Sequence, residues 1–378
     1  MDEQKLVPKL RFPGFTDPWE QRKLGEVFDE RNEKGEQGEL LSVTIGAGVV
    51  RTEDLERAVN TSDDRYNYKV VKKGDLIYNT MRMWQGACGS SLYTGIVSPA
   101  YTVLVPLAGN SSKFFAHYFK RKDLLYLFKR YSQGLTSDTW NLKFNVLKEI
   151  KICVPLIEEQ YKIADFLEAY DSNLTLHQRK LEHLKLKKKS LLQKLFPREG
   201  ELYPELRFPG FTDPWEQRKL GEIYKRVNER NDGTLGRDKW ISVAKMYFQD
   251  PEKVQSNNLD TRTYVMKKGD IAFEGHPNNE FKFGRFVLND IGTGIISELF
   301  PIYRPIVKYD LEFWKYAIQL ERIMAPIFSK SITSSGNSSN KLDQNHFLNQ
   351  MISIPTIDEQ KKIGLILKTI TNLITLHQ

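Results

Sequence analysis

The 378-residue chain is poor in cysteine: Cys88 and Cys153 are the only two, and they cannot form a disulfide framework. No apolar run approaches the roughly 18 residues that a membrane span requires. The first five residues, MDEQK, lack the basic and apolar stretches of a signal peptide. We therefore expect a reducing, cytoplasmic location and no membrane partner.

Catalytic motifs are missing as well. The sequence has no Asn-Pro-Pro-Tyr-type motif of adenine methylation, no glycine-rich cofactor turn after a strand and no P-loop. Its histidines lack the spacing to cysteine of a zinc site; they are His117, His177, His183, His276, His346 and His377. We therefore expect no catalytic residue, no metal and no cofactor in this chain.

The positive charge is concentrated in one segment. Hydrophobic residues make up 40% and charged residues 28%, as in an ordinary globular protein, and the net charge is +8. Residues 179–198 contain eight basic residues and one acid, so this segment carries +7 of the total. A basic coat over the whole surface is therefore excluded. The segment is compatible with phosphate contact, and equally with a solvated helix face.

The sequence contains two copies of one unit. PKLRFPGFTDPWEQRKLGE at residues 8–26 matches residues 204–222 at 18 of 19 positions. VPLIEEQYKIADFLEAYDSNLTLHQ at residues 154–178 matches residues 354–378 at 11 of 25 positions. These offsets predict two tandem units of about 200 residues each.

Between these flanks the copies diverge. Short framework pieces survive, such as Lys-Lys-Gly-Asp at residues 72–75 and 267–270. Other segments differ in the type of residue that they contain. For example, MRMWQ at residues 81–85 corresponds to GHPNN at residues 275–279. Two recognition surfaces on one frame would produce this pattern, and so would neutral drift of surface loops after duplication.

Each unit is expected to be α+β. Short β-branched runs bounded by Gly, Pro and Asn predict strands, for example at residues 69–71, 75–78, 100–105 and 150–154. Aromatic and basic residues at helical spacing predict helices at 114–131 and 311–328, the second one ended or kinked by Pro326. Polar loops that contain glycine, at 132–137 and 334–339, precede the closing helices.

A helix with a coiled-coil seam closes each unit. Acidic first turns follow Pro155 and Pro355, and Pro197 and Gly200 should end the first helix near Phe196. Apolar positions that step by four and three form the seam: Ile163, Leu167, Tyr170, Leu174, Leu181, Leu184, Leu191, Leu195, Ile363, Leu367, Ile370 and Ile374, with His177 and His377 at equivalent packing positions.

Such a seam needs a partner. Pairing of the two closing helices would give an antiparallel two-helix coiled coil with a pseudo-two-fold axis. A helix over residues 158–196 would span roughly 58 Å. A coiled coil with another protein, or a dimer through these helices, is the alternative.

The chain resembles the specificity subunit of a type I restriction–modification system. The resemblance rests on RFPGFTDPWEQRKLGE, on VPLIEEQYKIADFL and IPTIDEQKKIGLIL, and on TLHQRKLEHLKLKKKSLLQKLF, and it covers the whole chain. It implies a first target-recognition domain at residues 1–155, a central shared helix at 156–200, a second recognition domain at 201–355 and a distal shared helix at 356–378. The distal helix is shorter than the family pattern, which leaves the full length of the coiled coil open.

The resemblance implies a DNA-binding subunit that is not an enzyme. Each recognition domain would read one half of a bipartite, asymmetric site in double-stranded DNA, while the helices set the gap and dock the methyltransferase subunits. The implied partners are two modification subunits, which bind S-adenosylmethionine and methylate adenine, and two restriction subunits, which use ATP and magnesium in host defence. An enzyme acting alone and a purely structural coiled-coil adaptor are the competing hypotheses.

Residue chemistry then selects candidate DNA contacts, since Arg pairs with guanine, and Asn or Gln with adenine, at a groove edge. For base contact we select Asn79, Arg82, Gln85, Thr136, Ser137 and Asn141 in the first unit, and His276, Asn278, Asn279, Lys282, Asn337, Asn340 and Lys341 in the second. For phosphate contact we select the lysines that both copies share, Lys72, Lys73, Lys267 and Lys268. Trp84 and Trp140 are either partly buried core residues or residues that stack on or wedge into DNA.

Overall fold

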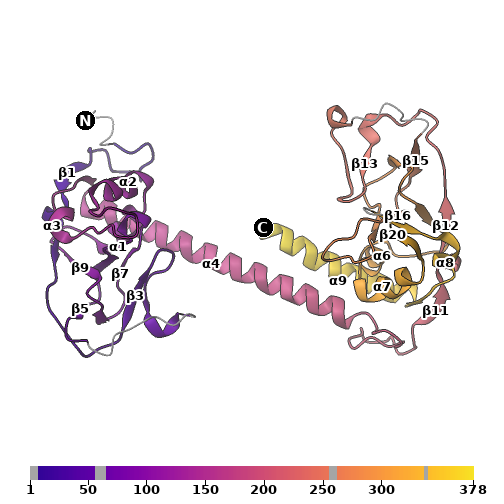
Figure 1. Cartoon of the computed structure of the whole chain (residues 1–378), viewed down its shortest axis with the longest axis horizontal. Helices are drawn as coiled ribbons and strands as arrows, with labels where there is room; N and C mark the ends of the chain where they lie inside the picture. Colours follow the sequence, from indigo (N-terminus) through magenta and orange to yellow (C-terminus); the bar gives the residue numbers. More distant parts are fainter. Residues whose placement is uncertain (1–6, 56–64, 255–261, 336–338) are drawn as a thin grey trace. The chain divides into compact units, whose positions relative to one another are not determined.

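The computed structural model describes residues 7–55, 65–254, 262–335 and 339–378. The chain divides into two compact units, Met1–Thr175 and Leu176–Gln378, and the division falls inside the long helix α4 (Ile157–Lys194) (Figure 1). The domain boundaries inferred from the resemblance, at residues 155, 200 and 355, stay a prediction.

Each unit has its own strands and helices. In unit 1 they are β1 (Glu20–Lys23), β2 (Phe28–Glu30), β3 (Leu41–Thr44), β4 (Gly48–Arg51), β5 (Lys69–Val71), β6 (Leu76–Asn79), β7 (Cys88–Ser90), β8 (Gly95–Val97), β9 (Tyr101–Pro106), α1 (Ser112–Tyr118), α2 (Lys122–Tyr131), α3 (Phe144–Leu147) and β10 (Lys151–Val154). In unit 2 they are β11 (Glu216–Lys219), α5 (Leu220–Ile223), β12 (Tyr224–Val227), β13 (Ile241–Ser242), β14 (Tyr247–Phe248), β15 (Thr263–Met266), β16 (Ile271–Glu274), β17 (Arg285–Leu288), β18 (Gly294–Ser297), β19 (Ile302–Pro305), α6 (Leu311–Ala317), α7 (Glu321–Ser329), β20 (Ile332–Ser335), β21 (Asn340–Leu342), α8 (Gln344–Leu348), β22 (Met351–Ile354) and α9 (Ile357–Leu376). The four strands predicted in unit 1 correspond to β5, β6, β9 and β10, which confirms them.

Both units are built on the same antiparallel sheet, with the order β2-β9-β6-β7 in unit 1 and β12-β19-β16-β17 in unit 2. Successive residues of β6 face opposite sides, as the pleat requires. Leu76 and Tyr78 join the core that contains Phe115 of α1, whereas Ile77 packs with Val103 in a second core. The predicted α+β class with an internal repeat is therefore confirmed.

The two matched flanks of each copy pair with each other. β1 pairs antiparallel with β10, and β11 pairs with β22 in the same register, so that Arg22 faces Ile152 and Arg218 faces Ile352. Segments separated by about 130 residues thus form one hydrogen-bonded ladder. This ladder is a structural reason for both flanks to agree between the copies.

A buried ion pair joins the same flanks a second time. Arg11 donates two hydrogen bonds to Glu159 in the first turn of α4, from Nε to Oε1 (2.9 Å) and from Nη2 to Oε2 (2.6 Å). Arg207 binds Glu359 of α9 in the same way, at 2.9 and 2.7 Å. Both glutamate side chains are 1% exposed, and the bond to Glu159 raises the pKa of Arg11. The acidic first turn therefore anchors the N-terminal flank as well as favouring the helix end.

The adjacent glutamine fastens a further helix to the same point. Gln160 Oε1 accepts a hydrogen bond from the backbone N–H of Ser111, the N-cap of α1 (2.8 Å), and its Nε2 donates to the Pro155 carbonyl (2.9 Å). Gln360 Oε1 accepts from the backbone N–H of Asp310, the N-cap of α6 (3.1 Å). Each Glu-Gln pair thus ties three segments together at the start of a closing helix.

Replacing Arg11 by alanine should destabilise unit 1 by about 3–5 kcal/mol, because Glu159 would keep a buried charge without its partner. The matched control, Lys23→Ala, removes the exposed pair with Glu149 and should cost far less, because solvent screens that pair. Urea unfolding curves measure both values. Equal costs for the two variants would contradict a special role for the buried pair.

The aromatic helical segments are broken where the sequence pattern gave no indication. The helix predicted at 114–131 is two helices, α1 and α2, and the one predicted at 311–328 is α6 and α7. Pro326 lies inside α7, which continues to Ser329, so this proline does not end the helix, and the alternative that it kinks the helix stays a prediction. The break before α7 lets Trp314 and Phe328 enter one core from different helices, each with 1% exposure.

The coiled-coil seam is buried where α4 and α9 meet in unit 2. There the two helices run in opposite directions (Figure 1). Leu184 and Leu191 of α4 share one apolar cluster with Ile363 and Leu367 of α9, and all four are at most 9% exposed. The predicted antiparallel pair is thus confirmed.

The first half of the seam is more exposed within unit 1. Tyr170 and Leu174 are 61% and 48% exposed. Ile163 and Leu167 are half-buried and line an apolar pocket of about 400 Å³, whose other walls include Leu10, Phe12 and Phe166. Equivalent seam positions therefore have different environments in the two units.

This difference predicts unequal effects at two equivalent leucines. Leu367→Ala should cost about 2–5 kcal/mol, because Leu367 is fully buried. Leu167→Ala, 200 residues earlier, should cost less, since the side chain already borders an open pocket. Urea unfolding of the two variants tests this, and an equal loss would mean that Leu167 is covered in solution.

Candidate nucleic-acid interface

The paired lysines precede tight turns of the same construction in the two units. The Lys72 N–H donates to Asp75 Oδ2 (2.7 Å), and the Lys267 N–H donates to Asp270 Oδ2 (2.8 Å). Gly74, with a φ of +94°, allows the left-handed turn that a side chain would strain. The Lys-Lys-Gly-Asp segment is therefore first of all a framework turn.

Within each pair the two lysines differ. Lys72 Nζ lies 3.0 Å from Glu33, and Lys267 Nζ lies 3.0 Å from Glu229. Lys73 and Lys268 are exposed and form no ion pair within the described part of the chain. Phosphate contact by these lysines stays a prediction, and the geometry favours the second lysine of each pair.

The loop between β6 and β7 supplies three of the predicted residues. Asn79 Oδ1 accepts from the Met81 N–H (3.0 Å), and Gln85 is half-buried with its Oε1 shielded from solvent. Arg82 is exposed. Arg82 is therefore the residue of this loop best placed for a base edge, while Asn79 and Gln85 shape the loop.

The loop at residues 132–142 lies against the first loop. Trp140 packs edge-to-face on Trp84 with ring centroids 5.3 Å apart, and the Leu142 N–H donates to the Thr80 carbonyl (2.9 Å). Both indoles are half-buried. They therefore act as partly buried packing residues that hold the two loops together.

The side chains of this second loop point in different ways. Thr136 and Ser137 are exposed, whereas Asn141 is half-buried and its Oδ1 has no partner among the described residues. Asn141 borders a polar hollow of about 410 Å³ that also contains Lys143 and Asn145. The sequence prediction did not include Lys143, the N-cap of α3, or Asn145 in the first turn of α3. Their closeness in sequence to Asn141 was the signal available.

In unit 2 the loop between β16 and β17 holds four predicted residues. Asn278 Oδ1 accepts from the N–H groups of Glu280 and Phe281 (2.9 Å each), so Asn278 forms the turn itself. The Lys282 Nζ lies 5.6 Å from the centre of the Phe283 ring. His276 and Asn279 are exposed and are the better candidates for base contact.

The second loop of unit 2 is the β20–β21 hairpin, which also contacts its neighbour. The Asn340 N–H donates to the Gly275 carbonyl (2.8 Å), so the backbone of Asn340 joins the two loops. Lys341 is exposed. Asn337 lies outside the described residues. In both units, then, the two selected loops are brought together, although base contact by their residues stays a prediction.

The basic segment forms the second half of α4. Lys185, Lys187 and Lys189 are exposed. Lys188 differs, because its Nζ lies 5.1 Å from the centre of the Tyr316 ring and burial lowers its pKa. Lys188 thus packs in unit 2, and the exposed lysines form the face that can meet an anionic partner.

The two seam histidines meet where α4 and α9 pair. His177 Nδ1 and His377 Nδ1 are 3.0 Å apart, and the ring centroids are 5.2 Å apart. Partial burial, and then the positive charges of Lys180 and His177, lower the pKa of His377. One hydrogen bond between the rings requires at least one neutral imidazole.

Unit 2 should therefore lose stability as the pH falls below the ordinary histidine pKa of about 6.5. Since folded His377 binds a proton less readily than unfolded His377, proton uptake favours the unfolded state. Urea midpoints measured on both sides of this pH should show the loss, and His377→Gln should reduce it. His183→Gln, at an exposed position of α4, is the control and should leave the pH dependence unchanged.

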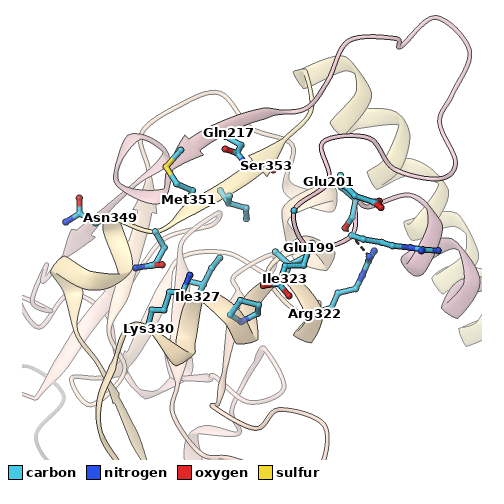
Figure 2. A pocket seen from close by; sticks show the side chains of 16 residues that line it. Glu199, Glu201, Gln217, Arg322, Ile323, Ile327, Lys330, Asn349, Met351 and Ser353 are labelled. Atoms are coloured by element: carbon cyan, nitrogen blue, oxygen red, sulfur yellow. Dashed lines mark hydrogen bonds between the residues drawn. The ribbon is translucent and has the colours of Figure 1, made fainter.

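A separate pocket of about 310 Å³ lies at the C-terminal end of α4 (Figure 2). Arg322 of α7 donates to four carbonyls there, those of Leu192, Gln193, Phe196 and Pro197, at 2.9–3.0 Å. Arg322 therefore caps the helix, whose free carbonyls attract a cation. None of the predicted DNA contacts lines this pocket, so we regard it as a structural feature.

In the part of the chain that the structure describes, no helix has both the length and the apolar character that crossing a membrane demands. Cys88 and Cys153 are both free thiols.

Comparison with known proteins gives consistent matches. The family model described as "Type I restriction modification DNA specificity domain" matches residues 16–186. The specificity subunit of the type I restriction enzyme MjaVIII from Methanocaldococcus jannaschii is 23% identical over 338 residues, which cover 82% of this chain and 75% of that protein.

Solved structures of similar proteins cover nearly the whole chain. The S subunit of a type I restriction–modification system from M. genitalium has a TM-score of 0.52 and 14% identity, over 98% of this chain and 94% of that one. The HsdS subunit from Thermoanaerobacter tengcongensis has a TM-score of 0.47 and 17% identity, over 98% and 92%.

The matched domain contains both loops of unit 1 and most of α4. The M. genitalium structure shares the fold, and the internal repeat carries the same sheet and ion pair into unit 2. Residues 16–186 thus match the DNA specificity domain of type I restriction–modification systems, and the chain is similar to specificity subunits of such systems over most of its length.

Proposed function

We propose that this chain is the specificity subunit of a type I restriction–modification system, in which each unit reads one half of a bipartite, asymmetric site in double-stranded DNA. Residues 1–155 would be the first recognition domain and residues 201–355 the second. The observation that carries this proposal is that one frame presents different loops. The β6–β7 loop contains Arg82, whereas the equivalent β16–β17 loop contains His276 and Asn279. Different donors and acceptors select different base pairs.

The second loop of each unit supports the same proposal. It is tethered to the first loop by the Trp84–Trp140 contact in unit 1 and by the Asn340–Gly275 hydrogen bond in unit 2. Two joined loops at equivalent places in the fold form one continuous reading surface. Exposed Lys73 and Lys268, which both units share, would contact phosphates and set the register without selecting a sequence.

The helices would perform the two remaining tasks of the subunit. The paired helices α4 and α9 would hold the gap between the half-sites, because a packed seam resists changes in helix register. The exposed lysines Lys185, Lys187 and Lys189 would meet acidic surface of the modification subunits or phosphates of the gap.

Specificity subunits are non-catalytic, and we infer that chemistry resides in the partners. Two modification subunits with S-adenosylmethionine would methylate adenine, and two restriction subunits with ATP and magnesium would complete the cleaving complex. The target adenine would then be flipped into a pocket of a modification subunit.

Exchange of residues 24–150 for the same segment of another specificity subunit tests the proposal, because both strands of the β1–β10 ladder stay in place. Methylome sequencing should then show one half of the modified motif changed and the other half and the gap length retained. Substituting Lys185, Lys187 and Lys189 with alanine is the control, which should weaken assembly or DNA binding without altering the motif. A motif that keeps both halves after the exchange would refute the assignment of one half-site to each unit.

A further inference from the structure

The tip of the second loop of unit 1 presents a single apolar side chain. Leu135 is 102% exposed, so it makes essentially no packing contact within the protein. Its neighbours in the tip, Gly134, Thr136, Ser137 and Asp138, are small or polar. An isolated leucine does not provide the extended apolar core of a protein–protein interface.

The backbone holds this leucine in a defined turn. Gln133 and Asn141 exchange two backbone hydrogen bonds, of 2.9 and 2.8 Å, at the base of the tip. Within it, the Thr136 N–H donates to Thr139 Oγ1 (3.1 Å), and the Thr139 hydroxyl donates to the Thr136 carbonyl (3.0 Å). Gly134 has a φ of +144°, and a Cβ there would lie 2.6 Å from the Thr139 carbonyl oxygen. The leucine is therefore presented on a preorganised support, which lowers the entropy cost of contact.

The support is in turn connected to the proposed reading surface. Trp140, which follows the tip, packs on Trp84 of the first loop, and the Lys129 Nζ lies 5.2 Å from the Trp140 ring centre. Arg130 at the end of α2 is exposed, as is Lys143 on the other side of the tip. Cations thus flank the tip, while the tip itself carries the carboxylate of Asp138, which disfavours a direct phosphate contact.

We propose that Leu135 is a wedge that enters the base stack of the half-site read by unit 1. Apolar side chains inserted between base steps unstack them, and unstacking lowers the cost of taking a base out of the duplex. Leu135 would be a positioning residue, because it would open the step from which the partner subunit withdraws its adenine. This proposal rests on the proposed function of unit 1. The sequence had suggested Trp84 or Trp140 for the wedge role. The proposal assigns this role to Leu135 instead.

The test uses the complex of the full chain with modification subunits and a duplex that carries the motif defined by methylome sequencing. 2-Aminopurine is placed in turn at each step of the two half-sites, and its fluorescence rises when the base is unstacked. Leu135→Ala should abolish the rise in the unit 1 half-site and slow methylation there by about tenfold or more. Leu135→Phe should retain both signals, and the unit 2 half-site should be unaffected by either variant.

Leu92→Ala, at another exposed leucine of unit 1, is the matched control and should behave as the unchanged protein. Leu135→Ala should keep the normal urea midpoint, because the side chain packs against nothing in unit 1. Unchanged fluorescence and methylation in Leu135→Ala would overturn the wedge. Weaker assembly with modification subunits in the absence of DNA would overturn it too, since Leu135 would then be a protein contact. Failure of the residue 24–150 exchange would instead refute the proposed function, whatever Leu135 does.

Discussion

The frame of each unit depends on one bidentate ion pair, Arg11–Glu159 in unit 1 and Arg207–Glu359 in unit 2. Each glutamate is almost fully buried, so its charge is tolerable only while the arginine is in place. Arg11 also donates to the Asp17 carbonyl (2.6 Å), which holds the Phe-Pro-Gly-Phe-Thr-Asp-Pro-Trp segment in position. The ion pair therefore couples the N-terminal flank to the start of the closing helix, and the β1–β10 ladder extends that coupling.

A frame held in this way allows the rest of a unit to change. Asp75 is paired with Arg31, which follows β2, whereas the equivalent Asp270 is paired with Arg304 of β19. Equivalent buried carboxylates are thus paired with arginines from different places in the fold. A backbone hydrogen bond joins the two loops in each unit, and unit 1 adds the packing of Trp84 on Trp140. Recognition surfaces can diverge because their supports are not tied to one set of side chains.

The seam residues of α4 and α9 share one sequence pattern but lie in two different environments. Ile363 and Leu367 of α9 are buried against the second half of α4, whereas the equivalent Ile163 and Leu167 border an open pocket. Burial, and not the pattern alone, determines how much a seam residue stabilises the protein. The loop tip at Leu135 is the reverse case, an apolar side chain that folding leaves in water and that is free for an intermolecular contact.

The sequence by itself determined the duplication, the α+β class, the closing helices and their apolar seam, because these follow from repetition, period and local punctuation, whereas the antiparallel pairing of α4 with α9 was decided by the tertiary structure. It also located the loops, since they are where the copies differ. Tertiary structure alone decided which of their side chains are available: Asn278 is used to form its own turn, and Lys188 lies on Tyr316. It alone revealed the breaks before α2 and α7 and the exposure of Leu135. The physical reason is that hydrogen bonding and burial of a side chain depend on segments distant in the chain, which local patterns do not encode.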